Sequence, residues 1–380
     1  MNTLAASPQS FLSNSRFACS ACMQQTFDKA VEQAAFFRLW SRLPALSGMA
    51  MIAVMLLPAP TASQVIQEQD RAAKTSTKTW VQPRTPDGQP DLQGVWTNVT
   101  LTPLERPPEF ANKPGLTAKE AAEYEKRTIQ QQSHDNATDR RGYNEFWAER
   151  GTTVAEGGRT SLIVDPPDGR IPPLTPQAQK AEEARARFMQ QHPADGPESL
   201  DLSARCIMRL DTSINHHADR SGVPMLPDAY NSNFQIVQTP GYVAILHERI
   251  HDVRVIPLDG RPHVPPSVRT YLGDPRGHWE GDTLVVDTTN FTDKYNYRGS
   301  GPNLHLTERF TRVDANTINY EFTMDDPTTF TKPWTARIPM KATDDLIYEY
   351  ACHEGNYSMT DSLAGARAEE KKTAEAAKKH

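Results

Sequence analysis

The sequence predicts a mainly β protein: an antiparallel meander forming a barrel or a strongly curved sheet, with a few N-terminal helices and proline-rich loops packed on it. Three observations support this fold class. From Phe234 onward, apolar and polar residues alternate with a period of two, which is typical of strands that bury one face. Gly, Pro, Asn and Asp interrupt these runs at short intervals, as turns between consecutive strands require. The 30 prolines among 380 residues lie mostly between the runs and disfavour a helical bundle.

The N-terminal part of this β-rich domain, which we place at 91–363, is predicted to hold two strands and two helices. Thr117 and Glu120 form a capping-box pattern that opens a charged helix. Thr175 followed by Pro176 supplies an N-cap and a proline at the first helical position. In chain order, the elements are a strand at Gly94–Trp96, a helix at about 117–132, a strand at Leu162–Val164 and a helix at about 176–190.

The C-terminal part is predicted to consist of consecutive strands joined by short turns, so that neighbours pair antiparallel. With Gly94–Trp96, these strands are enough to close a barrel. The Ala-, Glu- and Lys-rich tail at 364–380 is expected to be a solvated helix or disordered. The predicted strands are Phe234–Gln238, Tyr242–Pro257, Thr283–Thr288, His305–Val313, Thr317–Met324, Trp334–Ala342 and Leu346–Cys352.

Residues 1–63 have the layout of a secretory leader. Arg38 and Arg42 precede an apolar run at Leu43–Pro60, and small residues follow it. Prolines interrupt this run, and its apolar core is shorter than the roughly 20 residues of a membrane-spanning helix. We therefore expect that this leader is cleaved and that the protein is exported to the periplasm or the exterior, with an uncleaved membrane anchor as the alternative. Residues 64–90 are polar and are interpreted as a linker.

Charge and cysteine content limit the partners and the compartment. The net charge of −6 shows no basic excess, which disfavours nucleic acid as a partner and leaves a small molecule. Cys206 and Cys352 are the cysteines that remain after the leader, and in an oxidising compartment they are predicted to form a disulfide. Two separate buried thiols are the alternative.

The segment Tyr242–Pro257 contains His247-Glu248-Arg249-Ile250-His251, which matches the zinc-protease pattern H-E-x-x-H. That pattern binds zinc from a helix, where positions i and i+4 share one face. The β-branched residues here favour a strand, on which the two histidines would lie about 13 Å apart. Zinc–nitrogen bonds of about 2 Å cannot span that separation. Polar side chains on both strand faces instead indicate that one face lines a polar cavity, with a solvent-exposed ladder of ion pairs as the alternative.

Four longer motifs resemble the landmarks of a large group of exported bacterial proteins of unknown function. They are Pro86–Trp96, Ser161–Arg170, His278–Val286 and Ala351–Tyr357. This resemblance spans about 83–360 and implies export from a bacterial cell, with no particular activity. Gly94-Val95-Trp96 also resembles the G-x-W opening of lipocalin-type barrels. That second likeness implies an up-and-down barrel with a central cavity, as in ligand carriers and in lipocalin-like hydratases and isomerases.

The leading functional hypothesis is an exported enzyme that performs acid–base chemistry of a lyase, hydratase or hydrolase type on a small molecule in the barrel, without a metal or cofactor. His251, His353 and Glu354 are the predicted catalytic residues because His and Glu exchange protons near neutral pH. Arg254 and Arg261 are expected to hold an anionic or carbonyl group. The predicted substrate-binding residues are Arg254, Asp259, Arg261, His263 and Asn356.

Two alternatives come from other classes. One is a non-catalytic periplasmic ligand-binding protein of lipocalin-like type that uses the same cavity. The other is a metal-dependent enzyme that uses His251, His263 and a carboxylate. The test that separates these hypotheses is whether His251, His263 and His353 converge on one cavity.

Overall fold

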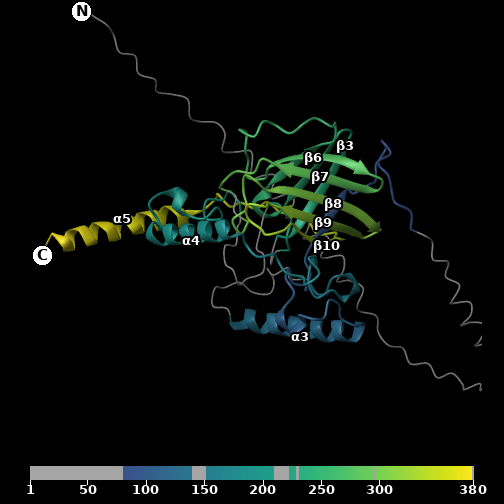
Figure 1. Cartoon of the computed structure of the whole chain (residues 1–380), viewed down its shortest axis with the longest axis horizontal. Coiled ribbons are helices and arrows are strands. Elements are labelled where there is room, and N and C mark those ends of the chain that lie inside the picture. The colour runs from purple at the N-terminus through teal and green to yellow at the C-terminus, as the bar shows by residue number, and fades with distance from the viewer. Residues whose placement is uncertain (1–79, 139–150, 209–221, 228–230, 295–296, 379–380) are drawn as a thin grey trace, which may run out of the picture. The chain divides into compact units, whose positions relative to one another are not determined.

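The computed structural model describes residues 80–138, 151–208, 222–227, 231–294 and 297–378 (Figure 1). They all belong to one compact unit, Lys78–His380. The predicted leader at 1–63 and most of the predicted linker lie outside the described residues.

Ten described strands form one antiparallel sheet, which confirms the mainly β prediction. The hydrogen-bonded order is β5-β4-β3-β1-β10-β9-β8-β7-β6, and β2 pairs with β10 beside this path. Strands β6 to β10 follow one another side by side in Figure 1. The strands are β1 (Gly94–Thr97), β2 (Ile163–Asp165), β3 (Asn233–Thr239), β4 (Tyr242–His247), β5 (Val253–Pro257), β6 (Asp274–Glu280), β7 (Thr283–Thr289), β8 (His305–Asp314), β9 (Thr317–Asp325) and β10 (Trp334–Ala342).

The two ends of this strand order meet, so the sheet forms a nearly closed barrel. The path has nine strands, each antiparallel to the next, and therefore its first and last strands run in the same direction. These strands, β5 and β6, contact each other, but no ladder of hydrogen bonds joins them in the described part of the chain. A loop at 258–273 returns from the end of β5 to the start of β6. We call the unpaired contact between β5 and β6 the seam.

The inward faces of the strands are packed with large apolar side chains. Burial alternates along most of β8 and β9 and along the first half of β10, as expected for strands with one dry face. Trp334 lies at the centre of an aromatic cluster and contacts Tyr297, Phe322 and Phe330 at centroid distances of 5.4–6.1 Å. Trp96 of the G-x-W triplet is also buried, and its indole nitrogen donates to the carbonyl of Leu92 at 3.0 Å. The interior is therefore filled by side chains, as in small barrels.

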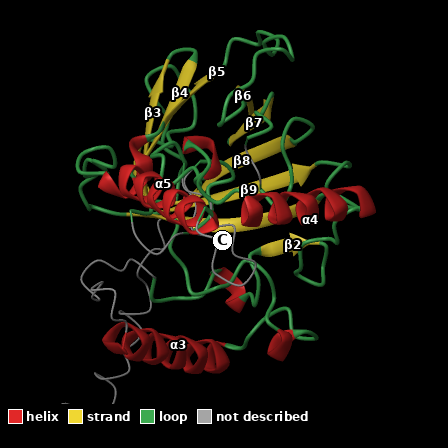
Figure 2. Cartoon of the chain, turned by 90° about the vertical axis from the view of Figure 1, so that its left-hand side faces the viewer, coloured by secondary structure: helices red, strands yellow, loops and turns green. Residues whose placement is uncertain are grey.

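Three helices accompany the sheet in the described residues: α3 (Ala118–Thr138), α4 (Pro176–Gln191) and α5 (Tyr357–Ala377). The capping box is present, since Glu120 Oε2 accepts from the backbone N–H of Thr117 at 2.9 Å. Thr175 caps α4 through a bond from Ala178 N–H at 3.1 Å. Arg367 of α5 donates to the carbonyls at 194 and 195 just after α4, and Figure 2 shows these helices close together. None of the described helices is long and apolar enough to cross a membrane.

Short 3-10 turns complete the described secondary structure. They are η1 (Pro108–Phe110), η3 (Glu156–Gly158), η4 (Pro197–Ser199) and η5 (Arg249–His251). The last of them has the greatest consequence, because it lies inside the segment predicted as a single strand.

Three details of the strand prediction are wrong. Tyr242–Pro257 is a hairpin of β4, η5 and β5, because Ile250 (φ 62°) and His251 (φ 63°) turn the chain in the left-handed region. Leu346–Cys352 forms no strand; the N–H of Tyr348 donates to the Glu248 side chain rather than to a neighbouring strand. Strand β6 was not predicted. The tail at 364–380 was predicted to be a solvated helix or disordered, and its part up to Ala377 belongs to helix α5, whose side chains are largely exposed.

Candidate functional site

A pocket of about 350 Å³ lies at the seam of the barrel. Its walls come from residues 207–208, from 252–255 at the start of β5, from 270–273 in the connecting loop, and from Pro275 of β6. The pocket lies where β5 and β6 touch without a ladder, so barrel closure creates it. Its volume falls in the range of small-molecule sites, and most of the residues that line it are apolar.

Asp252 is the acidic residue of this pocket. Its main-chain carbonyl accepts from His247 N–H at 2.9 Å and so closes the turn between β4 and β5. Its side-chain Oδ2 is buried and has no hydrogen-bond partner among the described residues. Burial raises the pKa of Asp252 to about 6, against a smaller opposing effect of the neighbouring His251. A carboxyl group with this pKa can gain or lose a proton near neutral pH.

Arg254 lines the same pocket, but its guanidinium group turns into the barrel. There it pairs with Glu308 through two hydrogen bonds, one of them at 3.1 Å between Nη1 and Oε1. Tyr320 O–H donates to the same carboxylate at 2.8 Å and accepts from Met225 N–H at 3.0 Å. All the side chains of this network are buried, and burial followed by the charge of Glu308 raises the pKa of Tyr320. The positive charge of Arg254 is therefore balanced inside the protein.

Sequence reasoning missed Glu308 and Asp252. A signal for Glu308 was present, because it lies between Leu306 and Phe310 on the apolar face of its predicted strand. Asp252 follows His251 directly, but its position at a pocket depends on the turn and on the seam, which no local pattern reveals.

The H-E-x-x-H motif lies in the β4–β5 turn, neither on a helix nor on one continuous strand. His247 is buried and stacked on Phe234 at a centroid distance of 4.3 Å, and burial lowers its pKa to about 3, so it stays neutral. Glu248 is buried and accepts from Asn233 Nδ2 at 3.0 Å. His251 is exposed. The two histidines therefore occupy opposite environments. In the described part of the chain, no group of three or more His, Cys, Asp or Glu side chains is arranged to hold a metal ion.

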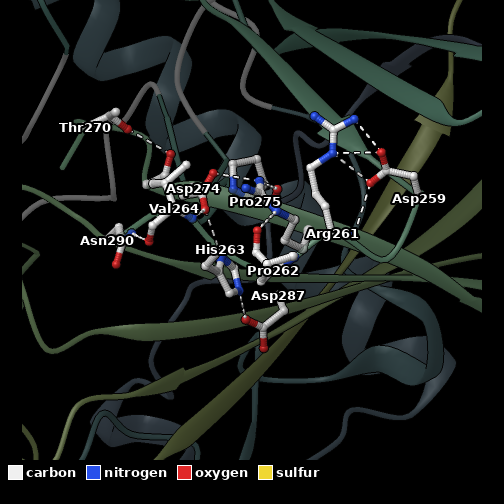
Figure 3. Close-up of polar contacts among 12 residues, drawn as sticks. Asp259, Arg261, Pro262, His263, Val264, Thr270, Asp274, Pro275, Asp287 and Asn290 are labelled. Carbon is white, nitrogen blue, oxygen red and sulfur yellow. Dashed lines mark hydrogen bonds and ion pairs between the residues drawn. The ribbon is translucent and has the colours of Figure 1, made fainter. Parts of the chain in front are cut away.

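His263 lies outside the barrel wall, where it fixes the 258–273 loop to the sheet (Figure 3). Its ring bridges Asp274 of β6 at 3.0 Å and Asp287 of β7 at 2.9 Å. His305 of β8 also bonds to Asp287. Burial acts to raise the pKa of Asp287, but the hydrogen bonds and charges of His305 and His263 together outweigh it and lower that pKa. The bond to Asp287 in turn raises the pKa of His305. These bonds hold the loop that carries one pocket wall.

Asp259 and Arg261 form an exposed ion pair at the other end of β5 (Figure 3). Arg261 Nε donates to both carboxylate oxygens of Asp259, at 2.8 and 2.7 Å, and Nη2 donates to Tyr242 O–H at 3.0 Å. The bond from Arg261 lowers the pKa of Asp259 to about 2. These partners satisfy each other, and neither residue lines the seam pocket.

The predicted disulfide between Cys206 and Cys352 is present, with the two Cα atoms 5.7 Å apart. It is consistent with an oxidising compartment. Asn356 reinforces it by donating to the carbonyl of Ala204 at 2.9 Å. Because pocket residues 207–208 directly follow Cys206, the disulfide and Asn356 hold this wall in place.

The three histidines of the predicted convergence lie in different settings. His251 is at the exposed turn next to Asp252, His263 is on the outer wall, and His353 is exposed beside the disulfide with Glu354. None of them lines the seam pocket. Of the predicted site residues, Arg254 alone belongs to its lining.

Comparisons of the chain with models of protein families, with curated proteins and with solved structures gave no match.

Proposed function

We propose that this protein binds a small organic molecule in the seam pocket. The observation that carries the proposal is a pocket of about 350 Å³ that is lined mainly by apolar residues and contains one carboxyl group, that of Asp252, with a buried unpartnered oxygen. Ligand sites for small molecules combine apolar walls with a few polar groups that orient the ligand. A lone carboxyl oxygen without a partner is costly unless a ligand supplies one.

The pocket walls are held before any ligand binds. The backbone N–H of Thr270 donates to the carbonyl of Asn290 at 3.1 Å, and its carbonyl accepts from the N–H of Thr292 at 2.9 Å. The hydroxyl of Thr270 donates to the carbonyl of Gly273 at 2.8 Å. The opposite wall follows Cys206 of the disulfide. Such preorganisation reduces the ordering cost of binding. Export to the periplasm or the exterior remains part of the proposal and is supported by the disulfide.

Acid–base catalysis is the second candidate, and one observation favours it. The pKa of Asp252, about 6, suits a group that takes and returns a proton near neutral pH. In this version Asp252 replaces His353 and Glu354 as the proton carrier, with exposed His251 as its neighbour. A lyase, hydratase or hydrolase reaction would then occur on the bound molecule.

The test is a binding screen of the full chain against small organic molecules, read by ligand-observed NMR. Val255→Trp adds bulk at the pocket wall. The control is Val237→Trp, which adds the same bulk on β3. Val237 lies two strands away from Val255, because Ala244 of β4 pairs with both residues. Both valines are about half exposed, so both variants should fold. Hits should lose binding in Val255→Trp and keep it in Val237→Trp. Binding that survives both changes places the ligand elsewhere and refutes the proposal.

The catalytic candidate is tested on the same hits. Each is incubated with the wild type and with Asp252→Asn, and its NMR spectrum is followed over time. Conversion by the wild type that stops in Asp252→Asn, with binding retained, supports catalysis. If the spectrum of every bound hit stays unchanged with the wild type, the catalytic candidate is rejected and the protein binds its ligand without converting it.

A further inference from the structure

We infer that the ligand of the seam pocket is a small organic cation, an amine on an apolar body, with the Asp252 carboxylate as its counter-ion. The inference rests on the proposed binding function and specifies the chemistry of the ligand.

The balance of charge at the pocket favours a cation. Two charged residues, Asp252 and Arg254, line it among the described residues. The guanidinium of Arg254 is neutralised by Glu308, and both side chains are almost fully buried, at 5% and 0% exposure. Asp252 therefore leaves the lining with an excess negative charge.

The Asp252 carboxylate also lacks, within the described part of the chain, a donor for its one buried oxygen atom. Oδ2 has no hydrogen-bond partner among the described residues. An ammonium group offers three N–H donors and a full opposite charge. Charge-assisted bonds of this kind are about twice as strong as neutral ones.

The remaining walls suit the apolar body of such a ligand. Met208 and Leu272 contribute flexible apolar surface, and Val253 and Val255 line the edge formed by β5. Tyr271 adds an aromatic ring, whose face attracts cations. The pocket thus combines an apolar and aromatic lining with a single acid.

An anionic ligand fits this pocket poorly, contrary to the role expected for Arg254 and Arg261. Arg254 would have to leave Glu308 buried without its partner, which is costly. Arg261 is held outside by Asp259 and Tyr242. Asp252 would in addition repel the anion.

The test uses three probes with the same phenyl body: 2-phenylethylamine, the neutral 2-phenylethanol and the anionic 3-phenylpropanoate. Their dissociation constants are measured by ligand-observed NMR on the full oxidised chain near neutral pH. The amine should bind at least about tenfold more tightly than the alcohol, which corresponds to ~1.4 kcal/mol, and the carboxylate should bind most weakly. Asp252→Asn should lower the affinity for the amine to that for the alcohol, and it should leave the affinity for the alcohol unchanged. Asp259→Asn, which removes a carboxylate outside the pocket, should change neither.

The outcomes separate the inference from the function on which it rests. If the alcohol or the carboxylate binds as tightly as the amine, and Val255→Trp abolishes that binding, the pocket binds small molecules and the cation inference is wrong. If amine affinity is unchanged by Asp252→Asn, the counter-ion assignment is likewise wrong. If no probe binds, or if binding survives Val255→Trp, the proposed pocket function fails together with the inference.

Discussion

Glu308→Ala is expected to destabilise the barrel strongly, because it removes one partner of a fully buried ion pair. In the structure, Glu308 accepts two bonds from Arg254 and one from Tyr320. The substitution leaves the guanidinium of Arg254 buried without its compensating charge. Breaking a buried pair in this way costs about 3–5 kcal/mol.

The matched control is Glu321→Ala on the neighbouring strand β9. Glu321 also pairs with an arginine, Arg337, but those side chains are 26% and 47% exposed. An exposed pair contributes at most about 1 kcal/mol. The double replacement Arg254→Met with Glu308→Leu removes both charges and fills the space, and it should restore stability to within about 1 kcal/mol of the wild type or exceed it.

The assay is equilibrium urea unfolding of the oxidised protein, followed by circular dichroism at constant pH. Glu308→Ala should lower the free energy of unfolding several-fold more than Glu321→Ala does. An equal loss for these two variants would refute the reasoning, since it would mean that Arg254 does not need its buried partner. A double variant as unstable as Glu308→Ala would attribute the loss to packing rather than to charge.

Three further predictions concern the carboxyl group at the seam, the outer-wall cluster and the disulfide. The folded-state pKa of Asp252, about 6, lies above its usual value of 3.8, so its contribution to stability is complete below pH 3.8 and is lost as pH rises through 6. Asp252→Asn should therefore be more stable than the wild type at neutral pH, by about 1–2 kcal/mol after solvent screening; thermal unfolding at acidic and neutral pH checks this, and equal stability at neutral pH contradicts it. The pKa of His305, measured by NMR titration, should lie above its usual value of 6.5 and should return toward that value in Asp287→Asn. If the substitution leaves the titration midpoint of His305 unchanged, the hydrogen bond between His305 and Asp287 does not raise this pKa. Cys206 and Cys352 should resist thiol labelling until the disulfide is reduced. Reduction should lower the free energy of unfolding by about 5 kcal/mol, because it removes the constraint on the unfolded chain. Rapid labelling of the native oxidised protein would argue against the disulfide.

The sequence was sufficient for strands whose inward positions carry large apolar residues. Trp334–Ala342 was predicted with the bounds of β10, because large apolar residues mark its inward face. Strand β6 was hidden by Pro275 and Gly277: an inward Cβ at Gly277 would lie 2.6 Å from Leu258, so the position takes no larger side chain and offers no apolar signal. The β4–β5 hairpin was hidden because its left-handed turn uses Ile250 and His251 rather than Gly or Asn.

The candidate site was less predictable for a different reason. The disulfide could be predicted from the cysteine count together with the expected export, whereas Arg254 lines the pocket but directs its guanidinium to Glu308 instead of to a ligand. The pocket itself arises where the two ends of the strand order meet, which depends on all nine strands of the path. No local pattern could show that Asp252 faces this seam while His263 faces outward.

The most direct test of the seam pocket is a titration of the full chain, carrying ¹³C-labelled methionine methyl groups, with 2-phenylethylamine. Met208 lines the pocket, whereas Met340 is buried on the inward face of β10 and is not part of the lining. Substitution of each by Leu assigns the two signals. The Met208 methyl signal should shift in a saturable manner while that of Met340 stays fixed. A saturable shift of Met340 without one of Met208, or no shift of either, would contradict the account.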